Sequence, residues 1–282
     1  MSAATGHLRV APQQLFQIFK YCVYTLLAVN ILLFLREEWL AAGHLFADGA
    51  PAAELIAVFA QTIDTAAWVV LLLLFELETF VIPEERIRGR LKLTLHGVRA
   101  FCYLFIVYAF WGYLTKYLAL LETVPVTVSD PCALVRDASY MVGADVFERI
   151  TSANCAVLPF APHMFELTAF DGRIVTDAAN LESAQLLALT DVINAGDWLL
   201  VVLLLEVDVR LEEAGRLHGA WRRGSQGTKI VLYSVLLGCA IYWWFEGDFL
   251  DFWDAFLWLV AFVFIELNLF EWHDPVPSAS TG

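Results

Sequence analysis

Six long apolar stretches are the feature that most constrains how this chain can fold. Four of them reach the roughly 18 residues that a helix needs to cross a bilayer, and aromatic residues extend the two shorter ones, 21–35 and 230–245, into the interface. The full set is residues 21–35, 55–82, 100–121, 186–209, 230–245 and 252–270. Because a membrane span cannot leave backbone polar groups unpaired, we expect six transmembrane helices in an all-α polytopic membrane protein.

One sizeable polar segment interrupts the apolar stretches and divides the chain. Residues 1–121 would hold transmembrane helices 1–3, residues 122–183 an extracytoplasmic cap with some strand, residues 184–272 helices 4–6 and residues 273–282 a cytoplasmic tail. Cys132 and Cys155 are the two cysteines of this cap. A pair of cysteines in an exterior loop predicts a disulfide in an oxidising compartment, the alternative being two free thiols.

The charge distribution gives an orientation. The chain is 60% hydrophobic yet has a formal charge of -14, the opposite of what a nucleic-acid binder needs. Of the 17 Lys and Arg residues, 12 lie in the N-terminal segment and the loops after the second and fourth stretches, against 5 elsewhere. By the positive-inside rule both termini are cytoplasmic. We expect a plasma membrane protein, in a bacterial inner membrane, with the lipid bilayer as its first partner.

The second, fourth and sixth stretches share a repeated pattern. A polar residue, a Trp four residues later and a Glu eight residues after that occur in each. The three copies are Asp64, Trp68, Glu76; Asn194, Trp198, Glu206; and Asp254, Trp258, Glu266. Three copies in alternate spans predict three helical hairpins of the same orientation, as parallel repeats about an axis along the membrane normal.

Helical geometry places these repeated residues in two groups. At 100° per residue, Asp64, Trp68 and Glu78 share one stripe, and Glu76 lies about 120° from Asp64. Carboxylates inside a membrane cost roughly 2.5 kcal/mol or more near its centre, so they need a cation, a proton or water. Depth matching predicts one ion pair in each hairpin. The pairs are Lys20–Glu76, Arg99–Glu206 and Lys229–Glu266. Alternatively, these basic residues only extend to the interface while the Glu side chains mark helix ends in water.

Carboxylates and amides remain on the tryptophan stripes after this pairing. Around a pseudo-threefold axis they would form an outer ring of Asp64, Asn194 and Asp254 and an inner ring of Glu78, Asp208 and Asn268. Such rings attract cations, so the sequence predicts a pathway for protons or for monovalent or divalent cations. The packing stripe of Trp68, Trp198 and Trp258 would fill much of the interior. The pathway should therefore be narrow or gated.

A second interpretation stays open. The same residues would only fasten helices together in a non-catalytic accessory or structural subunit, which docks a protein partner through its cap. An enzyme is not expected, because no nucleophile elbow, zinc-protease motif or phosphate-binding glycine loop occurs. We expect no cofactor and no bound metal, since the histidines lie outside the stretches.

Overall fold

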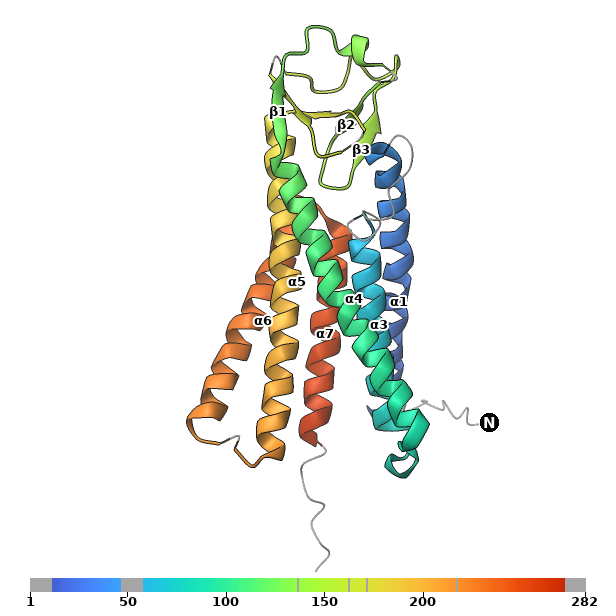
Figure 1. Ribbon diagram of the computed structural model, residues 1–282, viewed down its shortest axis with the longest axis vertical. Helices are drawn as coiled ribbons and strands as arrows, with labels where there is room; N and C mark the ends of the chain where they lie inside the picture. The colour runs from blue at the N-terminus through green and yellow to red at the C-terminus, as the bar shows by residue number, and fades with distance from the viewer. Residues whose placement is uncertain are drawn as a thin grey trace, which may run out of the picture.

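The computed structural model describes residues 12–46, 58–135, 137–161, 163–170, 172–216 and 218–271. Long helices lie side by side in a bundle, and a small β-rich cap covers one end of it (Figure 1). Five helices are long and apolar enough to cross a membrane, at residues 17–45, 60–79, 89–121, 178–212 and 220–246. The sixth predicted span is also a helix, but its side chains beyond Phe262 lie outside the described residues.

The six long helices form a closed ring in chain order. They are α1 (Pro12–Leu45), α3 (Ala60–Glu76), α4 (Gly89–Leu121), α5 (Ala178–Glu213), α6 (Ala220–Glu246) and α7 (Phe249–Glu271). Each packs against the next, and α7 packs against α1. Their outward faces are apolar: Leu32 is 65% exposed and Leu104 64% exposed. Apolar side chains that face outward over a whole bundle belong in lipid.

Helix α3 passes into irregular turns at the end opposite the cap. A π-helical turn, η1 (Leu77–Val81), continues α3, and a 3-10 turn, η2 (Glu84–Arg86), leads to α4. At the cap end, α6 stops at Gly247, whose φ of 85° is the left-handed conformation that favours glycine. The side chain of Asp248 then accepts a hydrogen bond from the backbone N–H of Asp251 in the first turn of α7. This tight turn makes α6 and α7 an antiparallel pair.

The cap is a five-stranded sheet inserted between α4 and α5. Its strands are β1 (Thr123–Val126), β2 (Ser139–Met141), β3 (Phe147–Arg149), β4 (Met164–Leu167) and β5 (Ile174–Thr176), in the spatial order β1-β4-β5-β2-β3. Only β2 and β5 pair in parallel among these strands. Asp130 begins the short helix η3 (Pro131–Leu134), and the predicted disulfide between Cys132 and Cys155 is confirmed.

Both faces of this sheet are covered. Because side chains alternate along a strand, Met141 and Ile174 pack with Trp243 and other residues of the helix ends, whereas their neighbours Tyr140 and Val175 pack into the interior of the cap. The cap also contacts α1, where the Gly172 N–H donates to the Leu45 carbonyl at 2.8 Å. These features define a mostly helical, multi-pass membrane protein with a disulfide-bonded cap.

Candidate functional site

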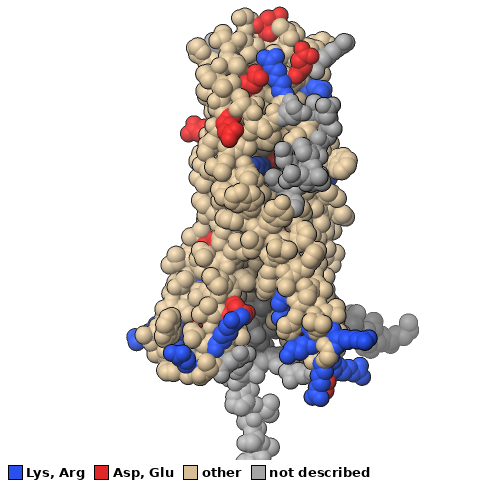
Figure 2. All heavy atoms as spheres, in the orientation of Figure 1, with Lys and Arg blue, Asp and Glu red and all other residues tan. Residues whose placement is uncertain are grey.

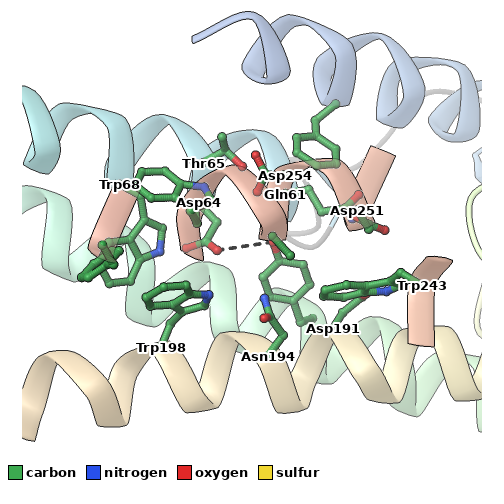
Figure 3. A pocket seen from close by; sticks show the side chains of 15 residues that line it. Gln61, Asp64, Thr65, Trp68, Asp191, Asn194, Trp198, Trp243, Asp251 and Asp254 are labelled. Carbon is green, nitrogen blue, oxygen red and sulfur yellow. Dashed lines mark hydrogen bonds between the residues drawn. The ribbon is translucent and has the colours of Figure 1, made fainter. Parts of the chain in front are cut away.

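A polar cavity lies inside the ring of helices, toward the cap end. Its volume is about 40 Å³, and all six long helices contribute to its wall. The lining residues are Phe34, Gln61, Asp64, Thr65, Trp68, Tyr113, Asp191, Asn194, Trp198, Trp243, Asp251, Asp254, Ala255, Trp258 and Phe262. Figure 3 shows carboxylates and amides from α3, α5 and α7 directed into one shared space. The predicted outer ring of Asp64, Asn194 and Asp254 is thus brought together.

Four carboxylates line this cavity: Asp64, Asp191, Asp251 and Asp254. Three of them accept hydrogen bonds from neutral donors. The Gln61 amide donates to Asp251 at 2.8 Å, the Asn30 amide donates to Asp254 at 2.8 Å, and the Tyr113 hydroxyl donates to Asp64 at 3.5 Å. Among the described residues none of the four forms a salt bridge.

Two polar atoms of the cavity wall lack a hydrogen-bond partner among the described residues. They are the acceptor Asn194 Oδ1 and the donor Trp243 Nε1. Trp243 is only 3% exposed, and its indole lies beside Asp191 (Figure 3), with which it interacts without reaching full hydrogen-bond geometry. Unsatisfied buried polar atoms cost roughly 1–3 kcal/mol each, so their presence in one cavity points to an occupant that is itself polar.

The three repeated tryptophans close the cavity on the side away from the cap. The rings of Trp68 and Trp198 lie 6.1 Å apart, and those of Trp68 and Trp258 lie 6.3 Å apart. On the side of the tryptophans away from the cap, aliphatic side chains such as Leu27 and Leu236 fill the interior. The tryptophan stripe therefore points toward a common interior and packs there, as the sequence predicts.

The ion pairs at the end opposite the cap agree with one of the three predicted pairs and correct another. Lys20 Nζ lies 2.5 Å from Glu76 Oε1, as predicted, and both side chains are buried. Arg99, however, pairs with Glu78 at 2.5 Å, while Glu206 pairs with Arg210 on its own helix. The Arg99–Glu206 pair is therefore wrong. Matching by depth fixes the level of a side chain but not the side of the helix from which its partner comes.

The third predicted pair, Lys229–Glu266, stays a prediction, and the structure gives Lys229 a different acid among the described side chains. Lys229 lies 2.9 Å from Asp208, which also accepts a hydrogen bond from Ser225. The side chains of Glu266 and Asn268 lie outside the described residues. Glu78 and Asp208 were predicted as the inner ring of the pathway, and this is corrected too, because both are engaged in ion pairs with Arg99 and Lys229.

A further ion pair joins helix α4 to the cap. Lys116 on α4 lies 2.5 Å from Asp145 in the turn between β2 and β3, and this pair borders a larger, mainly apolar cavity of about 260 Å³ between α1, α4 and the cap. The charge of Lys116 also acts on Asp191 in the smaller cavity. Glu38 on α1 has a structural role, since it accepts the backbone N–H groups of Gln61 and Thr62 at the start of α3.

The sequence interpretation missed several residues of the site. Gln61 and Asp251 were not recognised, and Asp191 was noted only as an acid without an assigned cation; each lies three positions before a residue of the predicted outer ring, so it shares that helix face. That spacing could have found them. Asn30, Tyr113 and Trp243 come from the other three helices, and no repeated spacing was recognised there.

Comparison with known proteins assigns no relative. No protein-family model, no curated protein and no solved structure matches this chain.

Proposed function

We propose that this protein provides a narrow or gated cation or proton pathway, as a channel or transporter, and that the polar cavity is its binding site. The observation that carries the proposal is the set of four carboxylates in the cavity, none of which has a salt-bridge partner among the described residues. Acids at such depth need a proton or a mobile cation. Apolar side chains would stabilise the bundle without the desolvation cost of four buried carboxylates, so a purely structural role does not require them.

The lining of the cavity supports an architecture of six spans in three repeated hairpins. Twelve of its fifteen lining residues fall into four sets of three at equivalent repeat positions. The sets are Gln61, Asp191, Asp251; Asp64, Asn194, Asp254; Trp68, Trp198, Trp258; and Phe34, Tyr113, Trp243. Members of the last set each stand 14 positions after Lys20, Arg99 or Lys229 (20+14, 99+14, 229+14). Each of the three hairpins would then contribute the same four positions to the wall of one cavity.

The ion pairs fit the same symmetry. In two cases the basic residue of one hairpin bonds an acid of the preceding hairpin, as Arg99 bonds Glu78 and Lys229 bonds Asp208. The corresponding third position is Asn268, which carries no charge. Lys20 pairs instead with Glu76 inside its own hairpin. These ion pairs lie between the tryptophans and the end of the bundle opposite the cap, where they would act as a gate.

The route would enter from the cap end. Lys116 borders the larger cavity beneath the cap, and its charge acts on Asp191 in the smaller cavity. Beyond the carboxylates, the tryptophans close the path. Opening toward the other side would require Trp68, Trp198 and Trp258 to separate.

The orientation is proposed with the cap outside and both termini in the cytoplasm of a plasma membrane. Figure 2 supports this, because Lys and Arg gather at the end of the bundle opposite the cap on the face shown. A disulfide in the cap also fits an oxidising exterior.

The test is ion flux in liposomes that contain the purified full-length protein. Asp64→Asn and Asp254→Asn remove two cavity carboxylates with little change in volume, and each should lower flux at least tenfold. Glu166→Gln is the matched control, because Glu166 lies in the cap and pairs with Arg173. If no proton or metal cation moves under any gradient or voltage, or if the control loses as much flux as the cavity variants, the proposal is wrong.

The accessory role remains the second candidate, on one observation. The cap has its own buried interior, formed by Tyr140, Ile150, Met164 and Val175 and closed by a disulfide, which is more structure than a simple lid requires. A stoichiometric partner that copurifies from native membranes, in a protein without flux, would favour this role.

A further inference from the structure

We propose that the ligand of the polar cavity is the proton, held by the carboxylates and by a small cluster of water molecules, and that metal cations do not bind there. This inference rests on the proposed function and narrows its substrate to one chemical class. It is carried by the hydrogen-bonding capacity of the wall, by the arrangement of the acids and by the size of the cavity.

The unpartnered donor is the first argument. Trp243 Nε1 carries a hydrogen that needs an acceptor, and a metal cation cannot accept a hydrogen bond. A water oxygen can accept it, and the same water can donate to a carboxylate or to the unpartnered Asn194 Oδ1. Water therefore satisfies both orphan atoms, whereas a bare cation satisfies only the acceptor.

The arrangement of the acids is the second argument. No group of three or more His, Cys, Asp and Glu side chains in the described part of the chain is placed to hold a metal ion. Instead, the cavity acids take hydrogen bonds from neutral donors one at a time: Gln61 on Asp251, Asn30 on Asp254 and Tyr113 on Asp64. Each of these bonds engages one carboxylate oxygen, and a carboxyl group that accepts from a neutral donor on one oxygen can carry a proton on the other.

The excess of acidic over basic groups around the cavity also favours a bound proton. The groups that face it are Asp64 from α3, Asp191 from α5 and Asp251 and Asp254 from α7, with Tyr113 and Lys116 on α4 and Glu38 on α1 nearby. Lys116 is already bonded to Asp145. Four carboxylates that line one small cavity cannot all remain ionised, and a proton that moves from water to a carboxylate oxygen removes one charge without adding a bulky ion.

The size of the cavity is the third argument. Its 40 Å³ give room for about three water molecules, since one water needs roughly 10–15 Å³. A hydrated sodium or potassium ion would need several waters of its own and a wider path past the tryptophans. A proton needs only a continuous chain of hydrogen bonds.

The experiment measures two quantities on the full-length protein in liposomes. Proton uptake is followed with an entrapped pH-sensitive dye, and sodium and potassium fluxes are followed with radioactive tracers under the same gradients. We expect proton flux without sodium or potassium flux. Trp243→Phe, which removes the N–H donor and replaces the indole by a smaller aromatic ring, should lower proton flux about three- to tenfold, the equivalent of one lost hydrogen bond. Trp244→Phe is the matched control, because Trp244 is the next residue and faces outward at 55% exposure; it should leave the flux unchanged.

Infrared difference spectra provide a readout that does not depend on transport. Protonated carboxyls give a C=O stretching band that shifts in heavy water, and Asp64→Asn or Asp254→Asn should diminish that band. Size-exclusion profiles identify variants that fail to fold. Proton flux with these band changes supports the inference.

Sodium or potassium flux that persists without proton movement, or a carboxylate band that shifts on addition of sodium chloride, overturns the inference while the proposed pathway stands. Equal flux loss in Trp243→Phe and Trp244→Phe overturns it as well. Absence of flux for every ion overturns the proposed function and this inference together.

Discussion

Replacing Lys20 by methionine would leave the Glu76 carboxylate buried without its cation. The two side chains are 8% and 9% exposed, and their charged atoms are 2.5 Å apart. Removal of one partner from a buried pair costs about 3–5 kcal/mol. Because the Tyr21 and Tyr24 hydroxyls still lie 3.4 Å from the Glu76 oxygens, we expect the lower end, about 3 kcal/mol of unfolding free energy.

The double variant Lys20→Met with Glu76→Gln should recover most of this loss, because no unpaired charge remains. Unfolding in detergent, followed by tryptophan fluorescence, measures all members of the cycle. Lys92→Met is the control, since Lys92 is an exposed basic residue on α4 near the same end of the bundle. A single variant as stable as Lys92→Met, or a double variant as unstable as the sum of the singles, would refute the reasoning.

Three further predictions concern the cap. Replacing Cys132 and Cys155 by alanine should destabilise it by about 3 kcal/mol, from a sequence separation of 23 residues, as measured by thermal unfolding with and without reductant. Gly172→Ala should loosen the cap from α1 and increase its proteolysis, because a Cβ there would lie 2.2 Å from the His44 carbonyl oxygen. Burial raises the pKa of Asp177, but hydrogen bonds from Tyr140 and from backbone N–H groups outweigh it and lower the pKa below its usual value. This stabilisation is present above pH about 4 and is lost as pH falls through the folded pKa, so Asp177→Asn should flatten the acid limb of a stability-versus-pH curve.

The repeated Trp pattern predicted which helix faces turn inward, because one stripe of α3, α5 or α7 can face only one direction. Asp64, Asn194 and Asp254 accordingly meet in one cavity. The disulfide was predictable because two cysteines shared one exterior segment. In both cases a spacing along the chain was enough to fix the geometry.

The partners of the ion pairs could not be predicted in the same way. Glu76 and Glu78 differ by two residues, which is about 200° around a helix, so they face different neighbours. Which helix stands on each side depends on how the ring closes, and the sequence of one helix does not specify that. Arg99 thus bonds Glu78 in η1, the π-helical turn that continues α3, rather than Glu206 on α5. The hydrogen bond of Asn30 to Asp254 joins α1 to α7 across 224 positions, beyond the reach of any local pattern.

The joints between the cap and the bundle have a mechanical consequence. Glu122 alone separates α4 from β1, and Asp177 alone separates β5 from α5. Both joints are stiff, since the Thr168 N–H donates to the Glu122 carbonyl and Asp177 accepts the N–H groups of Ala179 and Asn180. The sheet therefore restrains the tilt and rotation of α4 relative to α5. Because α1 is also bonded to the cap through the Leu45 carbonyl, we expect rearrangements of the bundle to involve α3, α6 and α7 moving relative to α1, α4 and α5.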